Sequence, residues 1–338
     1  MMISSNSRHT VTLRFLAAPT DAGHDGTVDA GVVLQWIDKA AYAAAVGWSK
    51  SYCVTAYVGN IHFTAPVRIG EMVEVTATIV YTGASSMHIS TTVVSGDPRT
   101  FGDPGVSAES RSQCLVIFVA VDEAGHPHPV PPFIASTPVE VLKRDHAISR
   151  IKVRSDIVEA MSRQEYTDAG SAEKVVLRFL SAPTDVNWGG KVHGGIVMKW
   201  IDEAAYVCAS RYAGHAAVAV FSGGVRFYHP VLIGDLVEVE ARLVYTGHKG
   251  MHIAVLVRSG DPATGVLELT TYCLTVMVIR DETGTALPVM PWVPVTDEDI
   301  RLAEHARELL EIRGRAPGNR LPNHLLDAVP ATGSQQSI

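Results

Sequence analysis

One segment of this chain occurs twice, at a constant separation of 164 residues. The sequence VLQWIDKAAY at 33–42 returns as VMKWIDEAAY at 197–206, and PVRIGEMVEV at 66–75 returns as PVLIGDLVEV at 230–239. After the SGDP at 95–98 the first copy carries about five extra residues. Two copies are too few for a solenoid. Because a two-fold interface is self-complementary, the repeat predicts a duplicated domain packed against itself as a pseudo-dimer.

Each copy carries the same pattern of expected elements. A short apolar strand (11–15 and 175–179) leads through a Pro-, Asp- and Gly-rich loop into a helix (31–46 and 195–210) that is apolar nearly all round. Over 73–79, Val, Ala and Ile alternate with Glu and Thr, which indicates a half-buried strand. Because helices and strands do not alternate, a parallel sheet is not expected. The sequence predicts an α+β fold with one long buried helix and an antiparallel sheet in each half.

These patterns divide the chain into four parts. An N-terminal domain covers 1–133, and a connector at 134–170 leads to a C-terminal domain at 171–295. The connector is charged and partly helical in pattern, so it either crosses the molecule or forms a flexible linker. The last part, 296–338, begins with a run that predicts a capped surface helix as far as Arg315 and ends in a tail expected to be disordered.

Composition and charge exclude several classes of protein. The net charge of −7 argues against a nucleic-acid-binding protein, which needs a basic stripe. No apolar run reaches the roughly 18 residues that span a membrane, and the first ten residues lack the apolar core of a signal peptide. The four cysteines are scattered without CxxC spacing, which predicts neither a zinc site nor a disulfide framework and favours a reducing cytoplasm.

The loop before the second helix carries the densest set of chemical groups. It reads DVNWGGKVHGG over 185–195, with an amide at Asn187, an imidazole at His193 and glycines at Gly194 and Gly195. Glycines at a helix start let a ligand approach backbone N–H groups that can stabilise a carbonyl oxygen gaining negative charge. A turn that is rich in glycine only for close packing gives the same pattern, so both interpretations stay open.

Each expected helix also holds one carboxylate among apolar side chains. Asp38 shares a helix face with Leu34, Ala41 and Tyr42, and Asp202 occupies the same place in the second copy. A carboxylate is costly to bury unless it is hydrogen-bonded or functional. These residues therefore predict either a general base or nucleophile, or a structural aspartate bonded across the interface between the copies.

Taken together, these motifs resemble the hotdog-fold acyl-CoA thioesterases that have two fused hotdog domains. The resemblance covers about 11–133 and 175–292 and rests on D-x-N-x-x-G-x-V-H-G-G, on the helix W-I-D-E-A-A and on F-x-x-P-V-x-I-G-D. It implies hydrolysis of an acyl-CoA to a free acid and CoA, with no metal or cofactor. It also implies that each sheet wraps its helix, that the two sheets join edge to edge, and that double hotdogs assemble as a homotrimer.

In this family the active site lies between two hotdogs, with an Asn from one loop and an Asp from the partner's helix. Asp38 and Asp202 both match the acid, whereas Asn187 has Gly23 as its mate in the first copy. The first loop has also lost most of the HGG motif. The resemblance therefore implies a decayed site that combines Asp202 with Gly23. The working site would combine Asp38 with Asn187, His193, Gly194 and Gly195.

The sequence gives only weak signals for the residues that bind the CoA phosphates of the substrate. Lys249, in an expected turn between strands, and Arg226 are the cations predicted to bind them, although surface solvation is the default for isolated cations.

Other functions remain as alternatives. Within the same fold, the chain could be an acyl-CoA hydratase or a thioesterase for acyl carrier protein. In a different class, it could be a non-catalytic acyl-CoA-binding or regulatory protein, which the eroded first loop favours. A purely structural scaffold is a further alternative, and the intact second loop argues against it.

Overall fold

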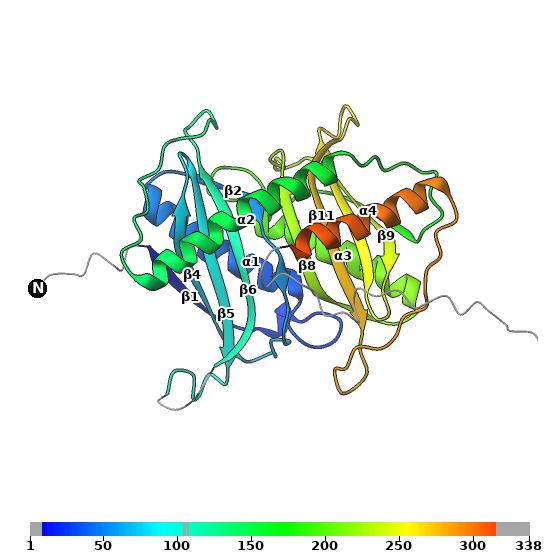
Figure 1. Ribbon diagram of the computed structural model, residues 1–338, viewed down its shortest axis with the longest axis horizontal. Coiled ribbons are helices and arrows are strands. Elements are labelled where there is room, and N and C mark those ends of the chain that lie inside the picture. Colours follow the sequence, from blue (N-terminus) through cyan, green and yellow to red (C-terminus); the bar gives the residue numbers. More distant parts are fainter. Residues whose placement is uncertain (1–8, 104–105, 107, 316–338) are drawn as a thin grey trace, which may run out of the picture.

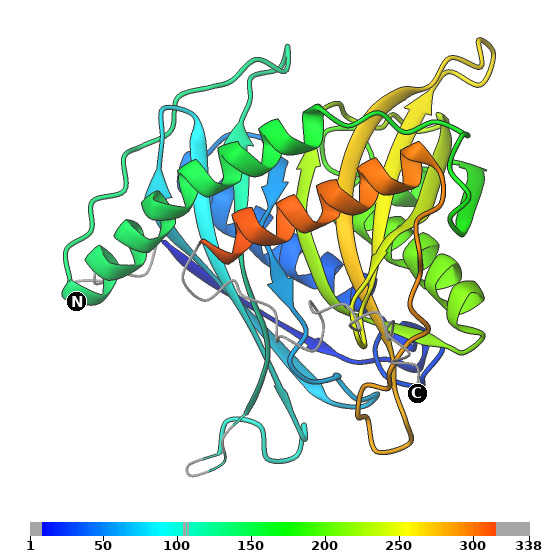
Figure 2. The same ribbon diagram turned by 45° about the vertical axis from the view of Figure 1, so that its right-hand side comes forward.

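In the computed structural model, residues 9–103, 106 and 108–315 are described, and they form one sheet with helices on both of its faces (Figures 1 and 2). The first half contributes strands β1 (Thr10–Leu16), β2 (Cys53–Val58), β3 (Ile61–His62), β4 (Met72–Thr82), β5 (Ser86–Gly96) and β6 (Glu109–Ala120). The second half contributes β7 (Lys174–Leu180), β8 (Ala217–Phe227), β9 (Leu236–Thr246), β10 (Met251–Gly260) and β11 (Glu268–Ile279). The helices are α1 (Ala30–Ser49), α2 (Pro138–Ser162), α3 (Gly194–Ala213) and α4 (Asp297–Gly314), with short 3-10 turns η2 (Pro19–Asp21) and η3 (Pro183–Asp185).

The two halves share a single antiparallel sheet. Its strand order in the described residues is β1-β4-β5-β6-β2-β8-β11-β10-β9-β7, and β3 also pairs with β8. The halves join where β2 lies beside β8, with Tyr57 opposite Arg226 and Val58 opposite Val225. This confirms the α+β tandem hotdog fold and the edge-to-edge junction expected from the sequence.

The long helices α1 and α3 pack against each other on one face of this sheet. A Cβ added to Gly31 would lie 2.7 Å from Cα of Lys199, and one added to Gly195 would lie 2.7 Å from Cα of Gln35. These two contacts are related by the repeat, as expected for a self-complementary interface. Only glycine permits backbones this close, so Gly31 and Gly195 set the distance between the halves.

Helices α2 and α4 lie across the opposite face of the sheet (Figures 1 and 2). The connector is therefore not a flexible linker, since 25 of its residues form α2, which crosses the molecule. The capped helix expected at 296 is α4, whose N-cap Thr296 accepts a hydrogen bond from Asp299 N–H. The tail expected to be disordered lies outside the described residues.

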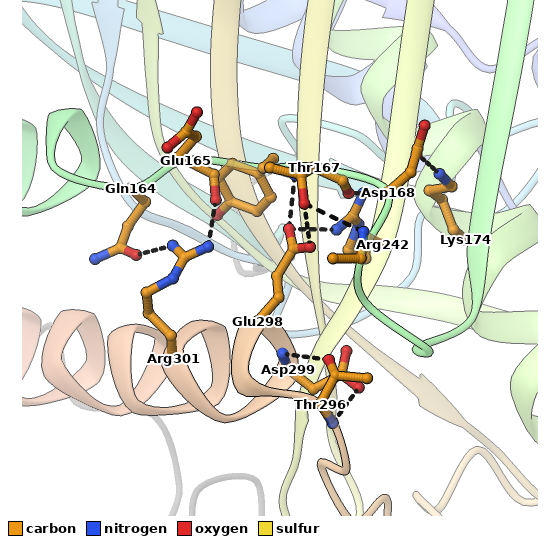
Figure 3. Close-up of polar contacts among 12 residues, drawn as sticks. Gln164, Glu165, Thr167, Asp168, Lys174, Arg242, Thr296, Glu298, Asp299 and Arg301 are labelled. Carbon is orange, nitrogen blue, oxygen red and sulfur yellow. Dashed lines mark hydrogen bonds and ion pairs between the residues drawn. The ribbon is translucent and has the colours of Figure 1, made fainter.

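A buried polar cluster holds α4 and the end of the connector to the second half of the sheet (Figure 3). The Arg242 guanidinium, with 3% of its side chain exposed, donates to Glu298 of α4 at 2.9 Å. Glu298 also accepts from the backbone N–H of Thr167 at 2.6 Å, and Arg301 donates to the carbonyl of Glu165 at 2.8 Å. Because the charges are paired and hydrogen-bonded, their burial is tolerated.

We predict that Gly31→Ala destabilises the fold by about 1–3 kcal/mol, because its methyl group would force the α1 and α3 backbones apart. Gly47→Ala in the same helix is the matched control, since a Cβ there meets nothing within 4 Å. That control should be neutral or stabilising by up to about 1 kcal/mol. Urea unfolding measures both values, and equal effects of the two substitutions would contradict the close-contact argument.

Candidate active site

A cavity of about 340 Å³ lies between the two halves of the chain. One wall comes from α1 and β2 of the first half, and the other from the loop before α3 and the segment after β8. Asp38, Asn187, His193 and Gly194 all line it, so the structure brings these four predicted residues together.

Asp38 is the buried carboxylate of this cavity, with 1% of the residue exposed. Its Oδ1 accepts a hydrogen bond from the Thr55 hydroxyl at 2.9 Å, within the same half. Its Oδ2 accepts from Gly195 N–H at 3.0 Å, across the interface between the halves. The buried carboxylate is therefore satisfied by donors that only the assembled pair of halves provides.

His193 is the second group from the other half that contacts Asp38. Its Nδ1 lies 2.8 Å from Asp38 Oδ2 and 3.2 Å from the nitrogen of Gly195. When His193 carries its proton on Nδ1, both this nitrogen and the backbone nitrogen of Gly195 can donate to Asp38 Oδ2. The shorter distance from Nδ1 to Asp38 favours this assignment. The imidazole then fixes the orientation of the carboxylate.

The two glycines of the motif have different contacts. Gly195 N–H is engaged by Asp38, so it does not have the free N–H that the sequence suggested for polarising a carbonyl. The N–H of Gly194, the first residue of α3, has no acceptor among the described residues. A Cβ on Gly194 would lie 2.9 Å from Thr55 Oγ1 and 3.3 Å from Asp38 Oδ2, so glycine lets the start of α3 lie this close to Thr55 and the carboxylate.

Asn187 lies in the loop between η3 and α3. Its Oδ1 accepts from Gly189 N–H at 2.8 Å and from Lys191 N–H at 3.1 Å, which closes the loop. The neighbouring Trp188, 71% exposed, stacks on Tyr42 of α1 with ring centroids 4.6 Å apart. The turn at 187–191 is thus closed by its own hydrogen bonds and held against the first half by the stacking contact of Trp188.

The rest of the cavity is largely apolar, which suits a hydrocarbon chain. Lys191 and His229 of the second half also line it. The cations predicted as CoA contacts do not: Arg226 packs over the Tyr228 ring, and Lys249 lies in the turn between β9 and β10.

Sequence reasoning missed Thr55, although a signal was present. Its mate in the second copy is Ala219, so the hydroxyl occurs only beside Asp38. The same asymmetry distinguishes Asn187 from Gly23. Comparing the copies residue by residue along the strands as well as the loop would have identified it.

The equivalent place around Asp202 is built differently. Asp29 occupies the position equivalent to His193, and its Oδ1 accepts from Gly31 N–H at 2.8 Å. His24 stacks on Tyr206 with centroids 4.2 Å apart, and the remaining cavity measures about 80 Å³. Burial raises the pKa of Asp202 well above its ordinary value, and the Asp29 carboxyl raises it further.

Comparisons with known proteins show which proteins this chain resembles. The Thioesterase superfamily profile matches residues 25–101 and 189–266. The chain is 26% identical over 329 residues to the cytosolic acyl coenzyme A thioester hydrolase of Mus musculus, covering 93% of this chain and 86% of that protein. It is 31% identical over 148 residues to protein VdlD of Helicobacter pylori, covering 44% of this chain and 84% of that protein.

A solved structure is similar in fold alone. It is an acyl-ACP thioesterase from Bacteroides thetaiotaomicron, 10% identical, with a TM-score of 0.52 over 79% of this chain and 97% of that chain. Within the described ranges, no helix is both long and apolar enough to cross a membrane.

We predict that Asp202→Asn stabilises the protein, and more so at about pH 8 than at about pH 5. A carboxyl whose pKa is raised by folding loses its stabilising contribution as the pH rises from its unfolded-state pKa towards its folded-state pKa. The amide has no charge to bury, so Tm should rise by roughly 2 °C or more at the higher pH. Thermal unfolding at both pH values measures this, and a gain confined to the lower pH would contradict it.

Proposed function

This chain belongs to the thioesterase superfamily and is a thioesterase, and we propose that its cavity around Asp38 hydrolyses acyl-CoA to a carboxylic acid and CoA. The supporting observation is one buried carboxylate that accepts hydrogen bonds from both halves at the wall of an apolar cavity. Relatives of similar length are named acyl coenzyme A thioester hydrolases, which supports acyl-CoA as the substrate.

Asp38 acts in this proposal as a general base. Its Oδ2 is occupied by Gly195 N–H and His193, whereas Oδ1 accepts only the Thr55 hydroxyl. A carboxylate oxygen has two acceptor sites, so Oδ1 keeps one for a proton from water. The hydroxide attacks the thioester carbon, the C–S bond breaks, and the proton on Asp38 goes to the departing CoA sulfur.

Groups from the loop of the second half stabilise the substrate carbonyl oxygen and orient the water. The open N–H of Gly194 lies at the start of α3, where the positive end of the helix dipole favours an oxygen that gains negative charge. Asn187 uses its Oδ1 within the loop, and its amide nitrogen, which neighbours the Tyr52 hydroxyl, is the group that orients water or the carbonyl in this proposal.

Lys191 and His229 are our assigned contacts for the phosphates of CoA. Both line the cavity, and the strong negative charge of the phosphates favours a cation there. They take the place of Lys249 and Arg226 in the sequence-based prediction.

The site around Asp202 is inactive in this proposal. It has Gly23 in place of the amide and Ala219 in place of the hydroxyl, and the stacked His24 and Tyr206 occupy its space. Its carboxyl is also held protonated to a higher pH than usual, because burial raises its pKa. A base must be ionised to accept a proton, so Asp202 is poorly suited to the reaction.

We predict that Asp38→Asn lowers acyl-CoA turnover by about 10²–10⁴-fold, the usual contribution of a general base. Asp202→Asn, the repeat-related control, should retain most of the activity. Release of free CoA thiol, measured over a series of acyl chain lengths, gives both values. The reverse pattern would show that the two sites have been assigned the wrong way round.

The same assay separates catalysis from binding alone. Tight binding of CoA by the wild-type chain, with no thiol release for any acyl length, would contradict hydrolysis. It would support the alternative of a non-catalytic acyl-CoA-binding protein.

We also propose that three copies assemble, which would give six hotdog units. Apolar side chains of α2 support a further interface, since Val139 is 61% and Leu142 is 71% exposed. Large exposed apolar side chains close together indicate an interaction surface. Light scattering should give a mass three times that of the chain, and Val139→Lys/Leu142→Lys should lower it. A monomeric wild-type protein would contradict the assembly.

The names of two relatives support a cellular location for this protein. Mouse and human relatives are both named cytosolic, and a cytosolic location is our proposal for this chain.

A further inference from the structure

Tyr52 lies between the end of α1 and the start of β2, against the turn of the second half that carries Asn187. Its backbone carbonyl accepts a hydrogen bond from Val121 N–H at 2.9 Å, just past the end of β6. Its side chain reaches across the interface between the halves, because a Cβ added to Gly189 would lie 2.2 Å from both Cζ and Oη of the ring. Tyr52 does not itself line the cavity around Asp38, so any effect on the reaction must pass through a neighbour.

The hydroxyl of Tyr52 is placed beside the amide of Asn187. Its oxygen is shielded from solvent and completes no hydrogen bond among the described residues. Burial raises the pKa of the Tyr52 phenol, and the neighbouring Asn187 side chain acts in the opposite direction, as a donor to the phenol oxygen does. Hydrogen bonds around catalytic groups often become short and well aligned only in the complex with substrate. Tyr52 and Asn187 are therefore placed to complete such a bond when the cavity fills.

The chemistry of the amide makes this neighbour important. Oδ1 of Asn187 accepts from the N–H groups of Gly189 and Lys191, which fixes the oxygen towards the loop backbone. The nitrogen carries two N–H donors in one plane, at a fixed angle to each other. When an oxygen outside the cavity accepts one of these donors, the direction of the second is set. Because Asn187 lines the cavity, the second donor is then available to groups inside it.

The tyrosine, the glycine and the amide occur together only on the side of Asp38. Their places in the other copy are taken by Ala216, Asp25 and Gly23, respectively. The side of Asp202 has thus lost the hydroxyl, the amide and the glycine that lets the ring approach the turn.

The aromatic stack on the same turn has been retained in both copies. Trp188 stacks on Tyr42, and the repeat-related pair is His24 on Tyr206. A contact that only holds the turn is therefore common to both sides. The hydroxyl of Tyr52 instead accompanies the amide, which indicates that the two groups work together.

We propose that Tyr52 is a positioning residue for the reaction at Asp38. Its hydroxyl oxygen accepts one N–H of the Asn187 amide in the complex with substrate and so directs the other N–H towards the reacting groups. Its ring supports the turn at Gly189. This role rests on the proposed hydrolysis, because it is exerted through a group that orients the water or the carbonyl.

Tyr52→Phe tests the role, because it removes the hydroxyl and keeps the ring. We expect kcat for acyl-CoA to fall about 3–10-fold, the usual effect of one hydrogen bond, with little change in KM, since the orientation of the amide matters in the transition state. Tm should not fall, because the hydroxyl has no completed hydrogen bond in the folded chain to lose. Thiol release and thermal unfolding measure these values. A hydroxyl with a merely structural role would lower Tm and leave kcat unchanged.

Tyr212→Phe is the matched control. The hydroxyl of Tyr212 donates to the carbonyl of Met290 at 2.8 Å, and this residue does not line the cavity around Asp38. The control should keep the kcat of the wild-type protein. Because Tyr52 acts through Asn187, Tyr52→Phe/Asn187→Ala should be no less active than Asn187→Ala alone.

The outcomes separate this role from the hydrolysis on which it rests. Unchanged kcat in Tyr52→Phe, an equal loss in the Tyr212 control, or losses that multiply in the double variant would each overturn the positioning role while hydrolysis stands. Absence of thiol release from the wild-type protein would overturn the proposed function, and the role of Tyr52 with it.

Discussion

The close approach of α1 and α3 is the constraint on which the rest of this structure depends. Gly31 and Gly195 let the two helices meet at backbone distance. That distance brings the start of α3 to the middle of α1, where Gly195 N–H and His193 reach the carboxylate of Asp38. A buried carboxylate without such donors would be strongly destabilising. The interface between the halves and the chemistry of the site are therefore set by the same contacts.

Duplication placed two equivalent sites in one chain, and the halves have since diverged around each. Beside Asp38 stand a hydroxyl, an imidazole and an open glycine N–H, whereas Asp202 faces a second carboxyl and an alanine. The outer faces diverged as well, with a packed apolar patch under α4 and a cavity between α2 and the first half of the sheet. In a fused chain each half has its own residues, so one half can change while the other stays the same.

Comparison within the chain predicted more of the site than composition did. The repeat marked Asp38 and Asp202 as equivalent, and the loss of Asn187's counterpart at Gly23 indicated which loop remained intact. That neither Lys249 nor Arg226 lines the cavity was not predictable, because distance to the cavity depends on how strands and turns pack in three dimensions. Nor was the use of Gly195 N–H: a helix start offers several free N–H groups, and only packing shows which of them Asp38 engages.

By itself the sequence determined the duplication, the α+β class and the two long buried helices, because these follow from periodicity and from residues repeated at one separation. It also marked Asp38 and the loop before α3 as candidates for a site. Only the tertiary structure decided that the Thr55 hydroxyl bonds to Asp38, that the connector is a helix, and that α2 covers a cavity on the outer face of the first half. Those features arise from contacts between residues far apart in the chain. Their energies depend on distance and burial, which a linear pattern does not contain.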